Sequence, residues 1–336
     1  MKALVAGWFS YVDGHATAGD VLARDLLCEW LEERGIEYEI AVAPPFAGGR
    51  NLNEIDSTGF SHAFFICGPW GWGELEQHFL HRFSRCRLIG LNLSLDRPPE
   101  AWNPFDLLIE RDSVRATHPD MLFGSRQSLP PLIGVCLVEP HPEADVDLAN
   151  STIDRLLARH PGARVEIDTR LDHNATGLRS ESEVEALIAR MDILVTTRLH
   201  GMVMALKNGV PPVVIDAVPG GGKIRRQCAM IGWSNLLGLD DLQDEKLDAA
   251  WAYASSSEGR AAARACAERA HAGVLELRDR IFAELAPGGE VERNFASRQS
   301  PAGFADFIAK LPPPRVVQDR GSASGFIGRI RKRLGR

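Results

Sequence analysis

Short apolar runs alternate with helical patterns from the beginning of the chain. Residues 2–7 read as a buried strand, and residues 20–34 show helical periodicity that ends at a glycine. A second strand is expected at 38–43, and the alternation continues with strands at 63–67, 88–93 and 107–109, a helix at 74–83, and a further strand beginning at Met121. Strands that alternate with helices are typical of a parallel sheet covered by helices. The pattern therefore predicts an α/β fold.

A second alternation follows a proline-containing linker at residues 128–131. It predicts strands at 132–138, 164–167, 193–196 and 212–215, and helices at 145–159, 180–190, 202–208 and, as one helix or two, within 255–285. A chain of 336 residues exceeds the usual size of a single core. We therefore predict two Rossmann-like domains that face each other across a cleft, one over residues 1–128 and one over 129–286.

The composition changes beyond this point, and residues 287–336 form a low-complexity segment with a basic end. From Arg315 to Arg336 there are seven Lys or Arg residues and one acid, Asp319, so this end carries +6 in a chain whose net charge is −7. Residues Phe326–Arg336 mix aliphatic and basic side chains. Two interpretations are open: a basic amphipathic segment that lies on an anionic membrane surface, or a solvated tail.

Composition also narrows the function classes. The six cysteines are scattered without a CxxC pair, so we expect reduced core residues instead of disulfides or a zinc site. The acidic body of the chain argues against general binding of nucleic acid. The first residues lead directly into a strand, and no apolar run reaches the roughly 18 residues that a membrane span needs. We therefore expect a cytoplasmic protein without a signal peptide.

The most informative short motif is Thr-Arg-Leu-His-Gly at residues 197–201. It places Arg198 and His200 after a predicted strand and before a predicted helix, where ligands bind in open α/β sheets and anions are favoured. Arginine can bind a carboxylate or phosphate with two hydrogen bonds, and histidine can transfer a proton near neutral pH. The structural alternative is that Arg198 binds a neighbouring carbonyl and His200 is a polar residue of the first helical turn.

The region around this motif resembles the C-terminal signature of the polysaccharide pyruvyl transferase family. Within residues 183–232 the shared elements follow in the same order: Asp192, Arg198-Leu199-His200-Gly201, Gly209-Val210-Pro211, Lys223 and Ile231-Gly232. Weaker similarities in the first half are the loop 14–20, residues 110–113, which contain Arg111, and residues 118–120. The resemblance covers residues 1–240, approximately two thirds of the chain.

The resemblance implies an enzyme that transfers the enolpyruvyl part of phosphoenolpyruvate onto two hydroxyls of one sugar. The products are a cyclic ketal and phosphate, and the acceptor is a surface polysaccharide or its lipid-linked precursor at the inner membrane face. The implied architecture is similar to GT-B folds, with the acceptor on the first domain and the donor on the second. The resemblance implies no metal and no cofactor, because phosphoenolpyruvate is a substrate.

The resemblance also implies roles for individual residues. Arg198, with Leu199 beside it, and Arg111 are expected to bind the anionic groups of the donor, although an Arg-Asp pair can also be a salt-bridged turn. His200 is expected to be catalytic, as the general acid that protonates the methylene carbon. Lys223 follows three glycines whose amides could receive an anion, and an ordinary exposed lysine fits equally well.

The acceptor side is expected to include Gly19 and Asp20, although capping a helix is the simpler role for Asp20. Residues 68–73 read Gly-Pro-Trp-Gly-Trp-Gly where many members have a run of glycines. Trp70 and Trp72 are candidates for stacking on a sugar ring, or for packing. After the strand at 133–138 the chain continues with Glu139, without the arginine that some members show nearby.

Two other functions remain open on the sequence. A nucleotide-sugar glycosyltransferase uses the same architecture, because a fold does not determine function. It needs a ribose-binding carboxylate in the second half, and none stands out between residues 223 and 232. The other alternative is a non-catalytic scaffold that keeps the fold and binds a partner or membrane through its basic tail. The intact Arg198 and His200 argue against a scaffold.

Overall fold

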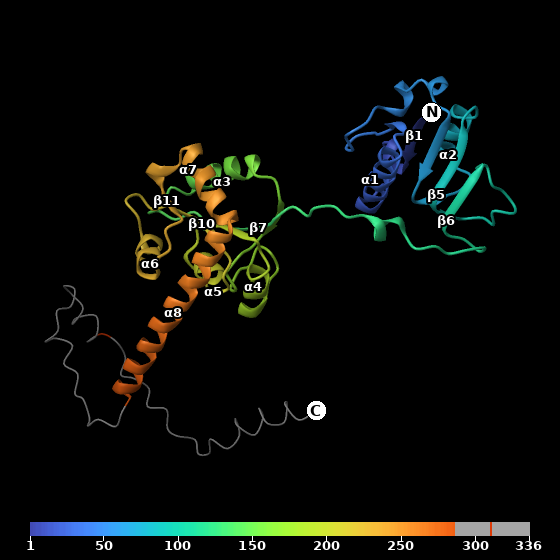
Figure 1. Ribbon diagram of the computed structural model, residues 1–336. Helices are drawn as coiled ribbons and strands as arrows, with labels where there is room; N and C mark the ends of the chain where they lie inside the picture. Colours follow the sequence, from blue (N-terminus) through green and yellow to red (C-terminus); the bar gives the residue numbers. More distant parts are fainter. Residues whose placement is uncertain (286–309, 311–336) are drawn as a thin grey trace, which may run out of the picture. The chain divides into compact units, whose positions relative to one another are not determined.

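The computed structural model describes residues 1–285 and Lys310, and the chain divides into two compact units between Pro130 and Pro131 (Figure 1). Each unit contains one parallel sheet with helices, so the α/β class is confirmed. The predicted tail at 287–336, including Phe326–Arg336, lies outside the described residues apart from Lys310.

The first unit is built on a six-stranded sheet. Its strands are β1 (Lys2–Gly7), β2 (Glu37–Ile40), β3 (His62–Ile66), β4 (Pro69–Trp70), β5 (Arg87–Leu95) and β6 (Leu107–Asp112), and its helices are α1 (Ala18–Glu33) and α2 (Glu74–Arg82). The strand order is β2-β1-β3-β5-β4, with β6 also paired to β5, and all pairs are parallel.

Helix α1 covers one face of this sheet because its apolar residues recur every four positions. Ala23, Leu27 and Leu31 are buried and pack in one cluster with the β1 residues Ala3 and Val5. This spacing places the three side chains on one stripe of the helix, which is the usual way in which a surface helix buries its apolar face.

The second unit contains a five-stranded sheet in the order β11-β10-β9-β7-β8. Its strands are β7 (Leu132–Cys136), β8 (Ala163–Glu166), β9 (Ile193–Thr196), β10 (Pro212–Asp216) and β11 (Leu236–Gly238). Its helices are α3 (Val146–Arg159), α4 (Glu181–Ile188), α5 (Leu199–Lys207), α6 (Lys223–Ile231), α7 (Asp244–Ser255) and α8 (Ser257–Glu284). The direction of strand order reverses between β7 and β9, and ligands bind outside the carboxyl ends of strands at such a switch point.

Strand β9 is buried on both faces, as expected for a central strand of a parallel sheet. Ile193 and Val195 belong to the cluster that includes Leu156 of α3, whereas Leu194 belongs to the opposite cluster with Ala205 of α5. Helices therefore cover both faces of the strand that leads into the Arg-Leu-His motif. The position of the motif is set by this layered packing.

One local prediction was wrong, one was confirmed with a sharper boundary, and one helix was missed. Met121 begins a 3-10 turn, η4 (Met121–Gly124), instead of a strand, because the Asp120 carboxylate accepts a hydrogen bond from the Leu122 N–H at 3.0 Å. The long helix begins at Ser257, where the Ser256 hydroxyl caps it, and α7 before it was not predicted.

Across the described residues, no helix combines the length and the apolar composition that crossing a membrane requires.

Candidate functional site

The Arg-Leu-His motif leaves the carboxyl end of β9 and enters α5, in a loop that hydrogen bonds hold to β7. The Thr196 hydroxyl donates to the Cys136 carbonyl at 2.6 Å and accepts from the Arg198 N–H at 3.0 Å. The Thr197 hydroxyl accepts from the Val138 N–H at 2.9 Å. These bonds extend the contact between the two strands beyond the sheet, so the motif lies at the switch point.

The guanidinium group of Arg198 is held by three groups from two loops of the second unit, those after β7 and β8. Its Nε donates to the Leu137 carbonyl at 3.0 Å, Nη2 lies 2.5 Å from Glu139 Oε2, and Nη1 lies 3.7 Å from Asp168 Oδ1. Only 14% of its side chain is exposed. The structural alternative, in which Arg198 binds a neighbouring carbonyl, is therefore observed in part. Two carboxylates balance the positive charge of Arg198.

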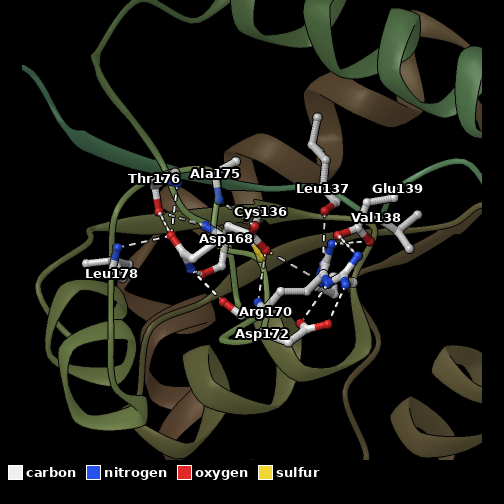
Figure 2. A network of polar contacts seen from close by, with 12 residues as sticks. Cys136, Leu137, Val138, Glu139, Asp168, Arg170, Asp172, Ala175, Thr176 and Leu178 are labelled. Carbon is white, nitrogen blue, oxygen red and sulfur yellow. Dashed lines mark hydrogen bonds and ion pairs between the residues drawn. The ribbon is translucent and has the colours of Figure 1, made fainter.

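The two carboxylates differ in how firmly the protein holds them. Asp168 accepts hydrogen bonds from the backbone N–H groups of Arg170 at 2.9 Å and Ala175 at 3.1 Å (Figure 2). Its side chain is 13% exposed, whereas that of Glu139 is 45% exposed. Asp168 is therefore a fixed partner of Arg198, and Glu139 is a solvent-accessible one.

Both carboxyl groups have lowered pKa values. The hydrogen bond from Arg198 is the main cause for Glu139. Burial alone raises the pKa of Asp168, but the backbone donors of Arg170 and Ala175 and the charge of Arg198 outweigh it and bring that pKa below its ordinary value. Both groups are therefore ionised at neutral pH.

A second guanidinium group, that of Arg170, approaches the carboxylate of Glu139. Arg170 Nη1 lies 3.7 Å from Glu139 Oε1, and Arg170 Nη2 lies 2.6 Å from Asp172 Oδ2. Figure 2 shows Arg170, Asp172 and Glu139 in one network of polar contacts. We call Arg198, Arg170, Glu139, Asp168 and Asp172 the charged cluster. Among these five residues, only Arg198 was expected from the sequence to belong to the site.

His200 is the second residue of α5, and its side chain is exposed. Its ring makes no hydrogen bond to another residue within 1–285, so it can serve a ligand from the surface. Leu199 is partly buried and packs with Met202 and Ile224 in a cluster between α5, α6 and α8. The structure therefore gives Leu199 a packing role, and the expectation that it contacts the donor stays a prediction.

Lys223 is the first residue of α6 and lines a pocket of about 390 Å³. The pocket is also lined by Val138, Thr197, Asp216 and Arg226, so it opens at the carboxyl ends of β7, β9 and β10. Since Thr197 adjoins Arg198 in the chain, Lys223 and the Arg-Leu-His motif border the same region of the second unit.

The glycine loop before α6 is not the free set of amides that the sequence suggested. The Gly221 N–H donates to the Val218 carbonyl at 2.9 Å, and the Gly222 N–H donates to the Asp216 carboxylate at 2.7 Å. Asp216 is 1% exposed and also accepts from the N–H groups of Val218 and Arg225. The buried Asp216 carboxylate therefore already accepts hydrogen bonds from backbone amides of the loop that was expected to bind an anion.

In the first unit, Arg111 lies on β6 and is paired with its own neighbours. Its Nε lies 3.1 Å from Asp112, its Nη1 lies 3.2 Å from Asp120, and it also donates to the Ser94 hydroxyl. The salt-bridged alternative is therefore what the structure shows, and a role in donor binding requires Arg111 to exchange one of these partners.

Asp20 has a capping role, as the simpler interpretation held, but it is not the N-cap. Thr17 is the N-cap of α1, and the Asp20 carboxylate accepts from the Thr17 N–H at 2.6 Å and from its hydroxyl at 2.8 Å. This capping box begins the helix two residues before the predicted start. Gly19 lies inside the first turn, where a Cβ atom would meet only ordinary contacts.

The two tryptophans of the 68–73 loop have different environments. Trp70 is 2% exposed, and its ring centroid lies 4.7 Å from those of Phe65 and Phe105. The expectation that Trp70 stacks on a sugar is therefore corrected, because the ring is part of the core. Trp72 is 54% exposed and touches Trp102 edge-on at 4.9 Å, so its stacking role stays a prediction.

Comparisons with known proteins bear on the second unit. Residues 144–217 match the family model for polysaccharide pyruvyl transferase. No curated protein matches the chain.

Several solved structures resemble the chain weakly. The glycotransferase of kitacinnamycin is 13% identical over 84% of this chain and 98% of its own, with a TM-score of 0.33. The UDP-GlcNAc 2-epimerase from Methanocaldococcus jannaschii is 10% identical over 82% of this chain and 100% of its own, with a TM-score of 0.30. The α,α-trehalose-phosphate synthase (UDP-forming) from Burkholderia vietnamiensis is 13% identical over 81% and 75%, with a TM-score of 0.33. Scores this low carry no conclusion about function.

The family match covers the segment from just before α3 to just after β10, which includes Asp168, Arg198 and His200. The resemblance to the polysaccharide pyruvyl transferase family is thus confirmed over residues 144–217.

Proposed function

We propose that the protein is a pyruvyl transferase that moves the enolpyruvyl group of phosphoenolpyruvate onto a sugar of a surface polysaccharide or of its lipid-linked precursor. One observation carries the proposal: the segment that matches the family places Arg198 and His200 together at the switch point of the second sheet. A cytoplasmic location and a membrane contact through residues 326–336 remain predictions from the sequence.

Donor binding requires two cationic positions, because phosphoenolpyruvate carries a carboxylate and a phosphate. Arg198 supplies one, and its guanidinium is oriented in advance by the Leu137 carbonyl and by Asp168. Lys223 supplies the other from the pocket that Thr197 also lines. Groups held in place before binding lose little freedom when the ligand arrives, which favours affinity.

The chemistry that we propose begins with a proton transferred from the His200 imidazolium to the methylene carbon of the donor, which becomes a methyl group. The neighbouring carbon then accepts one sugar hydroxyl oxygen, and that hydroxyl loses its proton. Phosphate leaves with the electron pair of its bond to carbon and takes up a proton. The second hydroxyl attacks the same carbon, loses its proton and closes the ketal. His200 suits the first step because it is exposed and sits on a fixed helix start.

The test is release of phosphate from phosphoenolpyruvate in the presence of a panel of glycan and lipid-linked sugar acceptors. We expect acceptor-dependent release by the native chain and a loss of about 10²–10⁴ in rate for His200→Asn, as for removal of a general acid. His271→Asn on α8 is the matched control, because that histidine is exposed outside the motif.

Binding measured in the same samples separates the alternatives. Phosphoenolpyruvate that binds the native chain, and binds Arg198→Gln more weakly, supports the donor site. If phosphoenolpyruvate does not bind while a sugar nucleotide does, the pyruvyl transferase proposal fails, and a nucleotide-sugar glycosyltransferase replaces it.

A further inference from the structure

The carboxylate of Glu139 lies between two guanidinium groups. Its Oε2 is 2.5 Å from Arg198 Nη2, and its Oε1 is 3.7 Å from Arg170 Nη1. Glu139 follows β7, Arg170 follows β8 and Arg198 follows β9, so three neighbouring strand ends of the second sheet bring these charges together. Both oxygens of one carboxylate therefore face a cation.

Glu139 is the carboxylate partner of Arg198 that can leave. Its side chain is 45% exposed, and within the described chain its ion pairs are with Arg198 and Arg170 alone. Asp168, in contrast, is mostly buried and held by two backbone N–H groups. If Glu139 turns into solvent, Arg198 keeps its ion pair with Asp168 and its hydrogen bond to the Leu137 carbonyl, so its orientation is preserved.

We propose that Glu139 occupies the position of the donor carboxylate, that the donor exchanges with it, and that Arg170 is a further donor-binding residue. This inference rests on the proposed function, which supplies a ligand with a carboxylate. Exchange keeps the Arg198 charge paired both with and without ligand, which avoids the cost of leaving a largely buried charge without a partner. Glu139 loses little on release because water already reaches it.

The ligand group at this position is a carboxylate and not the phosphate. A ligand carboxylate reproduces the two planar oxygens and the single negative charge that Glu139 presents to Arg198 and Arg170. Contacts between a charged guanidinium and a carboxylate oxygen are shorter and stronger than hydrogen bonds between neutral groups. Lys223 and Arg226, which line the adjoining pocket, are then left for the phosphate.

Calorimetric titration of the full chain tests the exchange with two probes. Pyruvate carries a carboxylate but no phosphate, and inorganic phosphate carries no carboxylate. We expect Glu139→Gln to bind pyruvate about three- to tenfold more tightly, because a competing charged partner of Arg198 is removed. Glu166→Gln is the matched control, because it removes the same charge. Glu166 is exposed at the end of β8 and makes no ion pair with a residue in 1–285.

The role of Arg170 has its own variants. Arg170→Gln should weaken pyruvate binding by about three- to tenfold in the Glu139→Gln background. The control Arg179→Gln, an exposed arginine later in the same loop, should leave it unchanged. Unchanged pyruvate affinity in Glu139→Gln, or a gain equally large for inorganic phosphate, overturns the assignment of this position to the carboxylate. Unchanged affinity in Arg170→Gln overturns the role of that residue.

Turnover separates this inference from the proposed function. If the native chain releases phosphate from phosphoenolpyruvate while Glu139→Gln shows no gain in affinity for pyruvate, the function stands and the inference fails. If Glu139→Gln binds pyruvate more tightly and no acceptor supports phosphate release, the carboxylate position stands and the proposed function fails.

Discussion

Gly201 lies directly against Cys136: a Cβ atom on Gly201 would be 2.8 Å from the Cys136 Sγ atom and 2.8 Å from the Thr196 Oγ1 atom. Both neighbours are fully buried, so neither can move aside easily. We expect Gly201→Ala to lower the free energy of unfolding by about 1–3 kcal/mol, the usual cost of overpacking a core. It should also shift the start of α5, and with it His200, and reduce turnover.

Urea unfolding followed by tryptophan fluorescence measures the effect. The matched control is Gly273→Ala in α8, where a Cβ atom would meet no other group within 4 Å. In a helix interior that change should stabilise by about 0.5–1 kcal/mol, because alanine loses less backbone freedom than glycine on folding. A Gly201→Ala protein as stable as the native one would contradict the close packing of α5 on β7.

Asp168 should act as a positioning residue for Arg198. Asp168→Asn removes the fixed charge 3.7 Å from the guanidinium while keeping the size of the side chain. We expect the dissociation constant for phosphoenolpyruvate to rise about three- to tenfold, because the guanidinium loses an ion pair that helps to fix its orientation. Asp154→Asn is the control, because that carboxylate is exposed on α3 and makes no ion pair with a residue in 1–285. Equal affinities in the native and Asp168→Asn proteins would remove Asp168 from the site.

The stability of the first unit should depend on pH through Glu110. Its side chain is 1% exposed, and Arg115 binds both of its oxygens at 2.9 Å. Burial raises the pKa of this carboxyl, but hydrogen bonds from its own backbone N–H, from Arg115 and from Ser113, together with the charge of Arg115, outweigh burial, and the net pKa is lowered. The folded pKa then lies below the unfolded value of about 4.3. The stabilisation is present above that value and is lost as pH falls through the folded pKa.

Arg115→Gln should weaken this dependence. Without the guanidinium, the folded Glu110 pKa rises toward the unfolded value, so the variant loses less stability than the native protein as the pH falls. At neutral pH we expect a loss of about 1–3 kcal/mol, since a buried charged group keeps fewer hydrogen bonds. Denaturant midpoints measured between pH 3 and pH 7 test both statements, with the exposed Arg126→Gln as control. Parallel pH curves for native protein and Arg115→Gln would count against them.

The two loop tryptophans should respond differently to truncation. Trp72→Ala should raise the acceptor KM about two- to tenfold with little change in kcat, as expected for loss of one aromatic contact of 0.5–1.5 kcal/mol. Trp70→Ala should instead destabilise the fold by about 3–5 kcal/mol, because it opens a cavity in the core. Steady-state kinetics and urea unfolding separate the effects, with the half-exposed Trp30→Ala as control. An unchanged acceptor KM in Trp72→Ala would leave that residue without a role in binding.

The apolar pattern located the central strands well, because a strand buried on both faces is apolar at nearly every position. Strand β9 occupies the predicted residues 193–196. The start of α5 is three residues earlier than predicted, since its N-cap, Arg198, makes no side-chain capping bond and so carries no capping signal. Helix α7 escaped prediction for a similar reason, because its N-cap Gln243 also makes no such bond.

The site could be predicted only in part. Local spacing placed Arg198 and His200 at a strand end, which the structure shows. The partners of Arg198 could not be derived, because Glu139 and Asp168 are distant in sequence and meet it through strand order and side-chain direction. One signal was present: each carboxylate follows a predicted strand within three residues, on a sheet edge where strand ends converge. The burial of Trp70 depends on Phe65 and Phe105, and no local sequence pattern predicts those contacts.

The groups that hold the Arg198 guanidinium, Leu137, Glu139 and Asp168, come from a single sheet and its loops. Recognition of an anion by this guanidinium therefore depends on the second unit. Under the proposed function, substitutions elsewhere in the chain can change which sugar is accepted while this guanidinium and its partners stay the same. Acceptor preference can then diverge between related chains that share one anion-binding sheet.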